Sequence, residues 1–154
     1  MAHLSIQNST LIPGRGADFD TNETLLSILA DPARHCVVLY PGPQASNISE
    51  AATDSWLPAG KICTILVIDG TWHCAKTMLR ESKILRTLPQ ICFTPGRESE
   101  YQFRRQPAPH CLSTIEAIHE VLNILEPGPQ ADELLFLFRS MVAQQIAFHP
   151  RPLS

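Results

Sequence analysis

Three apolar runs occupy the first two thirds of the chain, and each stops at a loop that contains glycine. The runs cover residues 36–40, 62–68 and 90–93, and the loops after them begin at Pro41, Asp69 and Thr94. Apolar runs without polar alternation predict strands that are covered on both faces, as in a parallel sheet. Residues 9–12, which Pro13-Gly14 cuts off, predict a further short strand.

Apolar residues at helical spacing fill the intervals between these runs. Asp20 and Glu23 have the spacing of a capping box, at the start of a helix that Asp31-Pro32 ends. Helical sequence also lies near residues 49–56 and at 72–85. This order of elements predicts an α/β fold with a largely parallel sheet flanked by helices.

The last third of the chain is predicted to be helical. Ser113-x-x-Glu116 is a capping box that opens a helix extending to Leu125, and Pro127-Gly128-Pro129 breaks that helix. A final helix at about 131–146 has an apolar face broad enough to cover one layer of a sheet. Because no repeat or linker divides the chain, residues 1–154 are expected to form one domain.

The amino-acid composition indicates a globular protein and not a membrane protein. The chain is 44% hydrophobic and 18% charged, as is usual for a globular protein. No apolar run approaches the roughly 20 residues that span a bilayer, so the expected location is the cytoplasm, away from the membrane. Five cysteines without a C-x-x-C pair, and six scattered histidines, predict reduced thiols and no metal site.

Charge is unevenly distributed along the chain. The net charge is −3, yet residues 76–105 contain seven cations and three anions, a net +4, so the remainder carries −7. Lys76, Arg80 and Lys83 fall at i, i+4 and i+7, which places them on one stripe of the predicted 72–85 helix. A basic face of this kind suits a polyanion such as RNA, although a solvated surface explains the same charges equally well.

The three glycine-containing loops point to a small-molecule site. In parallel α/β sheets, ligands bind outside the carboxyl ends of the strands, where such loops and helix N-termini gather. The chain has neither a Walker loop nor a G-x-G-x-x-G segment. The usual sequence motifs for binding nucleoside triphosphates and dinucleotides are therefore absent.

The loop after the second run resembles the D-x-T-W motif of the DTW domain family. Here it reads Asp69-Gly70-Thr71-Trp72, and an A-x-x-M segment, Ala75 to Met78, follows as in that family. Two later segments, Ser99-x-Tyr101-x-x-Arg104 and Leu112-Ser113-Thr114-x-Glu116-Ala117, are similar to the family's later motifs in order and spacing. The resemblance extends from about Ser9 to the C-terminus.

The resemblance implies a SPOUT-like α/β fold, in which the C-terminal part of the sheet forms a deep knot whose loops hold S-adenosylmethionine. It also implies the reaction, in which N3 of a uridine, most often in tRNA, attacks a carbon of S-adenosylmethionine. This carbon is the one next to sulfur on the amino-acid arm of that molecule. The 3-amino-3-carboxypropyl group is transferred and methylthioadenosine leaves.

The resemblance also implies roles for individual residues. Asp69 is the candidate catalytic residue, as base or acceptor for the N3 proton, although an aspartate after a strand is commonly only a helix N-cap. The implied cofactor contacts are Pro41, Gly42, Gly70, Thr71, Trp72, Leu112, Ser113 and Thr114. Capping alone would account for Ser113, and Trp72 is as compatible with the core as with a ligand wall.

RNA contacts are expected from two segments. Lys76, Arg80 and Lys83 offer a stripe for phosphates, and Tyr101, Arg104 and Arg105 offer an aromatic and two guanidinium groups that can stack on or clamp an unpaired base.

The chain departs from the family at its start, where the cysteine-rich zinc segment and the threonine-asparagine-threonine-glycine motif of bacterial members are absent. Two other functions fit the same residues. One is a SPOUT-type RNA methyltransferase that uses S-adenosylmethionine, and the other is a non-catalytic module that binds RNA or the cofactor.

Overall fold

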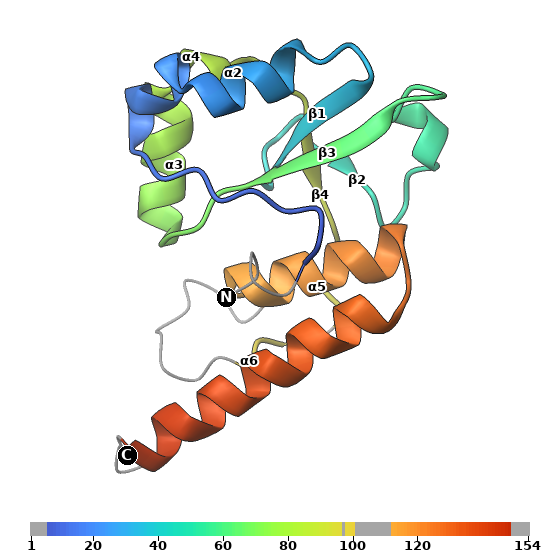
Figure 1. Cartoon of the computed structure of the whole chain (residues 1–154). Coiled ribbons are helices and arrows are strands. Elements are labelled where there is room, and N and C mark those ends of the chain that lie inside the picture. The colour runs from blue at the N-terminus through green and yellow to red at the C-terminus, as the bar shows by residue number, and fades with distance from the viewer. Residues whose placement is uncertain (1–5, 97, 101–111, 149–154) are drawn as a thin grey trace. The chain divides into compact units, whose positions relative to one another are not determined.

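The computed structural model describes residues 6–96, 98–100 and 112–148 (Figure 1). The chain divides into two compact units. One comprises Leu11–Thr94, and the other comprises Met1–Thr10 together with Pro95–Ser154. The single domain expected for residues 1–154 stays a prediction.

The first unit is built on a four-stranded sheet in which every pair of neighbours is parallel. Its strands are β1 (Arg34–Leu39), β2 (Ser46–Asn47), β3 (Ile62–Val67) and β4 (Gln90–Cys92), in the order β2-β4-β1-β3. The three strands predicted from the apolar runs are therefore confirmed, and so is the α/β class. The knot stays a prediction.

Burial along the strands follows their place in the sheet. Val37 and Val38 of the central strand β1 point to opposite faces, and both are 0% exposed. Strand β3 has a neighbour on one side only, and its residues are half-buried or exposed. The unbroken apolar run of β3 therefore predicted the strand correctly but overstated how far it is covered.

Helices cover the sheet face that carries Val38. Helix α2 (Glu23–Ala30), helix α3 (Trp72–Glu81) and helix α4 (Lys83–Thr87) follow the 3-10 helix η1 (Gly16–Thr21). Val38 packs with one buried leucine from each α-helix, namely Leu25, Leu79 and Leu85. This cluster fixes the helices that follow β3, and so fixes the loop that leads into them.

The predicted helix over 72–85 is interrupted, because Ser82 has an extended backbone with φ −83° and ψ 121°. Ser82 ends α3 and caps α4, since its buried Oγ accepts the Leu85 N–H at 3.1 Å. The same hydroxyl donates to Asp20 at 2.6 Å. These two bonds replace the helical continuity that the apolar spacing predicted.

Asp20 does not cap the helix that follows it, so the predicted capping box with Glu23 is wrong. Asn22 is the N-cap of α2, because its Oδ1 accepts the Leu25 N–H at 2.9 Å. The Asp20 carboxylate instead accepts the N–H groups of Lys83 and Ile84, each at 3.0 Å. Because the carboxylate that caps α4 lies more than 60 positions away in sequence, no local spacing of residues predicts this cap.

Two further predicted elements are not formed. Residues 9–12 are irregular, and the 49–56 stretch contains only the 3-10 helix η2 (Thr53–Ser55). Before η2, the side chain of Asn47 accepts the Ser49 N–H at 3.1 Å, which turns the chain away from helical geometry. Just ahead of this stretch lies β2, which is too short for a hydrophobic pattern to reveal.

The second unit contains α5 (Thr114–Leu125) and α6 (Pro129–Phe148), which pack against each other. The capping box of Ser113 and Glu116 is formed as predicted. Helix α6 begins two residues earlier than expected, because proline is tolerated in the first turn of a helix. Within the described residues, neither of these helices nor any other has the length and apolarity needed to cross a membrane.

The Asp20 cap predicts a specific dependence of stability on pH. Hydrogen bonds from Ser82, Ile84 and Lys83 lower the pKa of Asp20 in the folded chain. Its stabilising contribution is therefore complete above the unfolded pKa of about 3.9 and is lost as the pH falls through the lower folded value. We expect Asp20→Asn to lower the urea midpoint at pH 7, with a difference from wild type that shrinks below pH 4.

The control for this experiment is Asp54→Asn, because Asp54 is an exposed carboxylate in the same unit. A deficit of the Asp20 variant that persists unchanged at acid pH would show that the carboxylate charge is not what caps α4.

Candidate functional site

Three loops lie at the carboxyl edge of the sheet, because β3 and β4 both pair in parallel with β1. Tyr40 to Gly42 follow β1, residues 69–72 follow β3, and Thr94 follows β4 (Figure 1). We call these segments the carboxyl-edge loops. They contain five of the eight predicted cofactor contacts and the candidate catalytic residue, all in the first unit.

An aromatic contact joins the first two loops. The rings of Tyr40 and Trp72 have centroids 6.3 Å apart and planes inclined at 55°, a favourable tilted arrangement. Trp72 is the first residue of α3 and is 38% exposed. The ring is therefore not a core residue, and part of it can serve as the wall of a binding site.

The two glycines of these loops have close neighbours. The Gly42 N–H bonds to the carbonyl of Tyr40 at 2.8 Å, and a side chain at Gly42 would overlap the amide oxygen of Gln90. A Cβ atom on Gly70 would lie 3.3 Å from the Cβ of Cys74. The Cys74 Cβ therefore restricts side chains at position 70, whereas the flexible end of Gln90 can move away from a side chain at position 42. Gly70 is exposed and Gly42 is half-buried.

The cap of α3 is Thr71, not Asp69. Thr71 Oγ1 accepts the Cys74 N–H at 3.2 Å, while Asp69 lies two residues earlier and is exposed. The interpretation of Asp69 as a helix N-cap is therefore wrong. Its carboxylate lies at the edge of the sheet where ligands bind in α/β folds.

The third loop is fixed by hydrogen bonds that the sequence did not indicate. The Thr94 N–H donates to Ser49 Oγ at 3.0 Å, and Thr94 Oγ1 accepts from Asn47 Nδ2 at 2.8 Å. These partners are 45 and 47 positions apart along the chain. Sequence reasoning missed them because short polar residues in loops show no spacing that would relate them.

The remaining cofactor contacts expected from the sequence, Leu112, Ser113 and Thr114, lie at the start of α5 in the second unit and are half-buried. Ser113 Oγ accepts the Glu116 N–H, so capping is one established role of this serine. The structure also shows an unpredicted feature, since the fully buried Glu116 carboxylate accepts the N–H of Glu100 at 2.6 Å.

The predicted basic stripe is divided by the break at Ser82. Lys76 and Arg80 lie one turn apart on α3, but Lys83 is the first residue of α4 and does not continue their helical spacing. All three side chains are exposed, and Arg80 contacts Glu81 at 3.5 Å. Tyr101, Arg104 and Arg105 lie outside the described residues.

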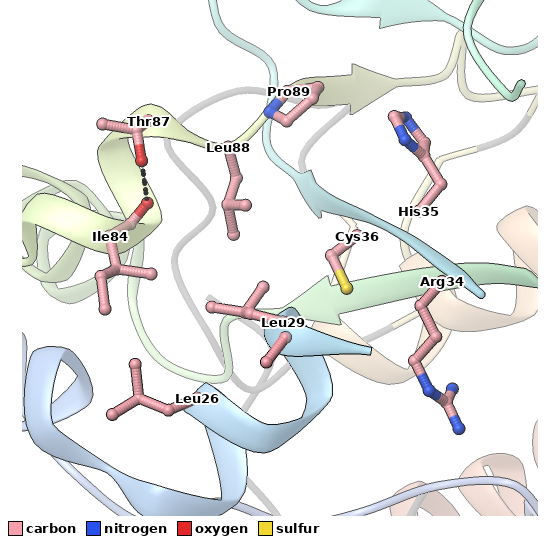
Figure 2. A pocket seen from close by; sticks show the side chains of 10 residues that line it. Leu26, Leu29, Arg34, His35, Cys36, Ile84, Thr87, Leu88 and Pro89 are labelled. Atoms are coloured by element: carbon pink, nitrogen blue, oxygen red, sulfur yellow. Dashed lines mark hydrogen bonds between the residues drawn. The ribbon is translucent and has the colours of Figure 1, made fainter. Parts of the chain in front are cut away.

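A surface depression lies elsewhere on the first unit. Its volume is about 510 Å³. Figure 2 shows its lining side chains, which come from α2, from the amino-terminal half of β1 and from the end of α4. The depression contains Cys36, and burial raises the pKa of that thiol, which keeps it protonated and weakly nucleophilic. Because the depression lies at the amino end of β1, we assign the candidate site to the carboxyl-edge loops instead.

No group of three histidine, cysteine or acidic side chains suited to a metal ion occurs among the residues that the structure describes.

Comparison with known proteins places the chain in a family. A model of the family described as DTW domain matches residues 1–146. The protein named tRNA-uridine aminocarboxypropyltransferase 2 of Macaca fascicularis is 36% identical over 99 residues, which are 64% of this chain and 32% of that protein. The Mus musculus protein of the same name gives the same identity and coverage.

The Drosophila melanogaster protein of that name is 30% identical over 138 residues, which are 88% of this chain and 52% of that protein. The chain thus spans about a third to a half of the length of these curated relatives. No solved structure matches it. Since the family model covers most of its residues, the chain belongs to the DTW domain family.

Proposed function

We propose that this protein transfers the 3-amino-3-carboxypropyl group of S-adenosylmethionine to N3 of a uridine in tRNA. Membership of the DTW domain family carries the proposal, since its curated relatives are named as tRNA-uridine aminocarboxypropyltransferases. The geometry supports it as well, because the motif loop 69–72 lies at the ligand-binding edge of a parallel sheet.

The reaction requires an acceptor for a proton. A bond forms between uridine N3 and the carbon next to sulfur, the carbon–sulfur bond breaks, and the N3 proton is lost. The donor supplies an electrophilic carbon and a leaving group, methylthioadenosine. Asp69 is exposed at the carboxyl edge, and we propose that its carboxylate receives or orients this proton.

The carboxyl-edge loops suit an adenosine. Tyr40 and Trp72 provide aromatic surface, and Gly42 and Gly70 leave room beside it because neither has a side chain. We propose that Pro41, Gly42, Gly70, Thr71 and Trp72 bind S-adenosylmethionine. Leu112, Ser113 and Thr114 stay candidates that the family resemblance alone implies.

RNA binding is proposed for the exposed cations of α3 and α4. Lys76 and Arg80 lie on α3, which begins in the motif loop at Trp72, so phosphates bound there would bring a nucleotide toward Asp69. Lys83 lies beyond α3, at the start of α4. Tyr101, Arg104 and Arg105 remain candidates for contact with the target base.

Product analysis tests the proposed reaction and the role of Asp69 together. Wild type incubated with tRNA and S-adenosylmethionine should release methylthioadenosine and form aminocarboxypropyluridine in equal amounts. Asp69→Asn should lower kcat by at least about 100-fold, as expected when a general base is removed, while the Kd for S-adenosylmethionine stays within about twofold.

Asp54→Asn provides the matched control, as an exposed aspartate outside the carboxyl-edge loops. Unchanged turnover by the Asp69 variant would remove Asp69 from the mechanism. S-adenosylhomocysteine with a methylated nucleoside would establish the methyltransferase instead, and cofactor binding without any product would favour the non-catalytic module.

The cations of α3 and α4 can be tested by charge reversal. We expect Lys76→Glu, Arg80→Glu and Lys83→Glu to weaken tRNA binding, each lowering the salt-dependence slope by about one for every phosphate that the side chain no longer neutralises. The control is Lys61→Glu, an exposed lysine at the amino end of β3. If the tRNA affinity and the salt-dependence slope of the Lys76, Arg80 and Lys83 variants match those of wild type and of the control, these cations do not bind RNA phosphates.

A further inference from the structure

Tyr40 connects the core of the first unit with the loop that contains the DTW motif. Its ring packs against the buried cluster that Val38 forms with one leucine from each of α2, α3 and α4. The same ring contacts Trp72, with centroids 6.3 Å apart. One half-buried aromatic side chain therefore lies between the core and an exposed indole.

The position of Tyr40 is fixed through its main chain as well as its ring. Its N–H donates to the carbonyl of Ile91 in β4 at 2.9 Å, and its carbonyl accepts the Gly42 N–H at 2.8 Å. Ile91 is buried, so the first of these bonds attaches Tyr40 to the interior of the sheet. The backbone bonds and the core contact together restrict where the ring can lie.

Trp72 needs support from outside its own helix. It is the first residue of α3 and is 38% exposed. Side chains of a helix normally lie over the preceding turn, and the first residue has no preceding turn to lie on. A neighbour from another element must therefore limit the rotamers of the indole, and among the described residues the Tyr40 ring is such a neighbour.

The tilt between the two rings leaves indole surface for a ligand. Their planes are inclined at 55°, so Tyr40 does not stack on Trp72. A stacked neighbour would cover one whole face of the indole. Every nucleobase can stack on an aromatic side chain, and the adenine of S-adenosylmethionine is the planar group that the proposed function brings to this loop.

We propose that Tyr40 is a positioning residue for S-adenosylmethionine, which holds the Trp72 indole in the orientation that stacks on adenine. Without the Tyr40 ring the indole samples further rotamers, and binding has to order it again, which lowers affinity. The inference rests on the proposed function and adds a role for a residue outside the D-x-T-W motif.

Two substitutions of Tyr40 separate the effect of the ring from that of core packing. Leucine keeps an apolar side chain on the core without a ring, whereas phenylalanine keeps the ring. We expect Tyr40→Leu to raise the Kd for S-adenosylmethionine about fivefold, the size of one lost aromatic contact, with kcat at saturating donor within about twofold. Tyr40→Phe should bind within about twofold of wild type, as calorimetry can measure.

Methylthioadenosine identifies the part of the donor that is affected. It contains the adenosine without the amino-acid arm, so Tyr40→Leu should weaken its binding by the same factor and leave the KM for tRNA within about twofold. Unchanged binding of both ligands would overturn the inference. So would a rise in the KM for tRNA alone, because Trp72 would then contact the RNA, or an equal loss in Tyr40→Phe, because the hydroxyl would then act.

Phe19→Leu is the matched control. Phe19 is also half-buried and packs against the same core cluster, from the 3-10 helix η1. This variant likewise replaces a ring on the core by leucine, so it should lower the urea midpoint without changing the Kd for S-adenosylmethionine. An equal rise in Kd would overturn the inference, because the effect would then be one of stability alone.

Indole N–H resonances of the labelled protein report the orientation of Trp72 without any ligand. The chain has two tryptophans, and Trp56 is buried, so its signal is an internal reference. We expect the Trp72 signal to move in Tyr40→Leu and to stay close to wild type in Tyr40→Phe, with the Trp56 signal unmoved. A wild-type Trp72 signal in Tyr40→Leu would show that Tyr40 does not orient the indole.

Measuring binding apart from turnover separates failure of this inference from failure of the proposed function. If wild type binds S-adenosylmethionine but forms no aminocarboxypropyluridine, and Tyr40→Leu weakens that binding, the positioning role stands and the proposed reaction falls. If wild type forms the product and Tyr40→Leu has the same Kd, only the positioning role falls. Wild type that binds no S-adenosylmethionine would overturn both.

Discussion

The arrangement of the first unit depends on the parallel pairing of β1 with two neighbours. All six residues of β1 pair with β3, and Val38 and Leu39 pair with β4 on the other side. Because the pairing is parallel, the chain leaves all three strands at the same edge. Burial of Val37 and Val38, each worth about 1.5–3 kcal/mol, stabilises the strand that sets this edge. The pairing brings the loops after β1 and β3 to this edge, where Tyr40, which follows β1, contacts Trp72, the first residue of α3.

Elements whose causes are local could be predicted from the sequence. The apolar runs identified β1, β3 and β4, and the capping box at Ser113 identified the start of α5. Their determinants lie within a few residues, so the spacing along the chain contains the information. The DTW motif identified the loop 69–72 in the same way, because its residues are consecutive.

Elements that depend on distant partners could not be predicted. The break at Ser82 and the cap of α4 both involve Asp20, which is more than 60 positions away, and local spacing assigned Asp20 to the wrong helix. The bonds of Glu116 with Ser99 and Glu100 were missed for the same reason, although the capping box already drew attention to the residue. In each case a polar side chain forms hydrogen bonds with a segment that is distant in sequence, and hydrophobic periodicity contains no signal for such a bond.

The central claim is that the carboxyl-edge loops bind the donor, and amide spectra of the labelled protein test it most directly. On addition of S-adenosylmethionine, the account predicts shifts at the Gly42 and Gly70 amides and at the Trp72 indole N–H. The amides of Ala30 and Cys36, which line the depression at the opposite end of β1, should stay unchanged. Shifts confined to Ala30 and Cys36, or no shift at the carboxyl-edge loops at saturating donor, would contradict the account.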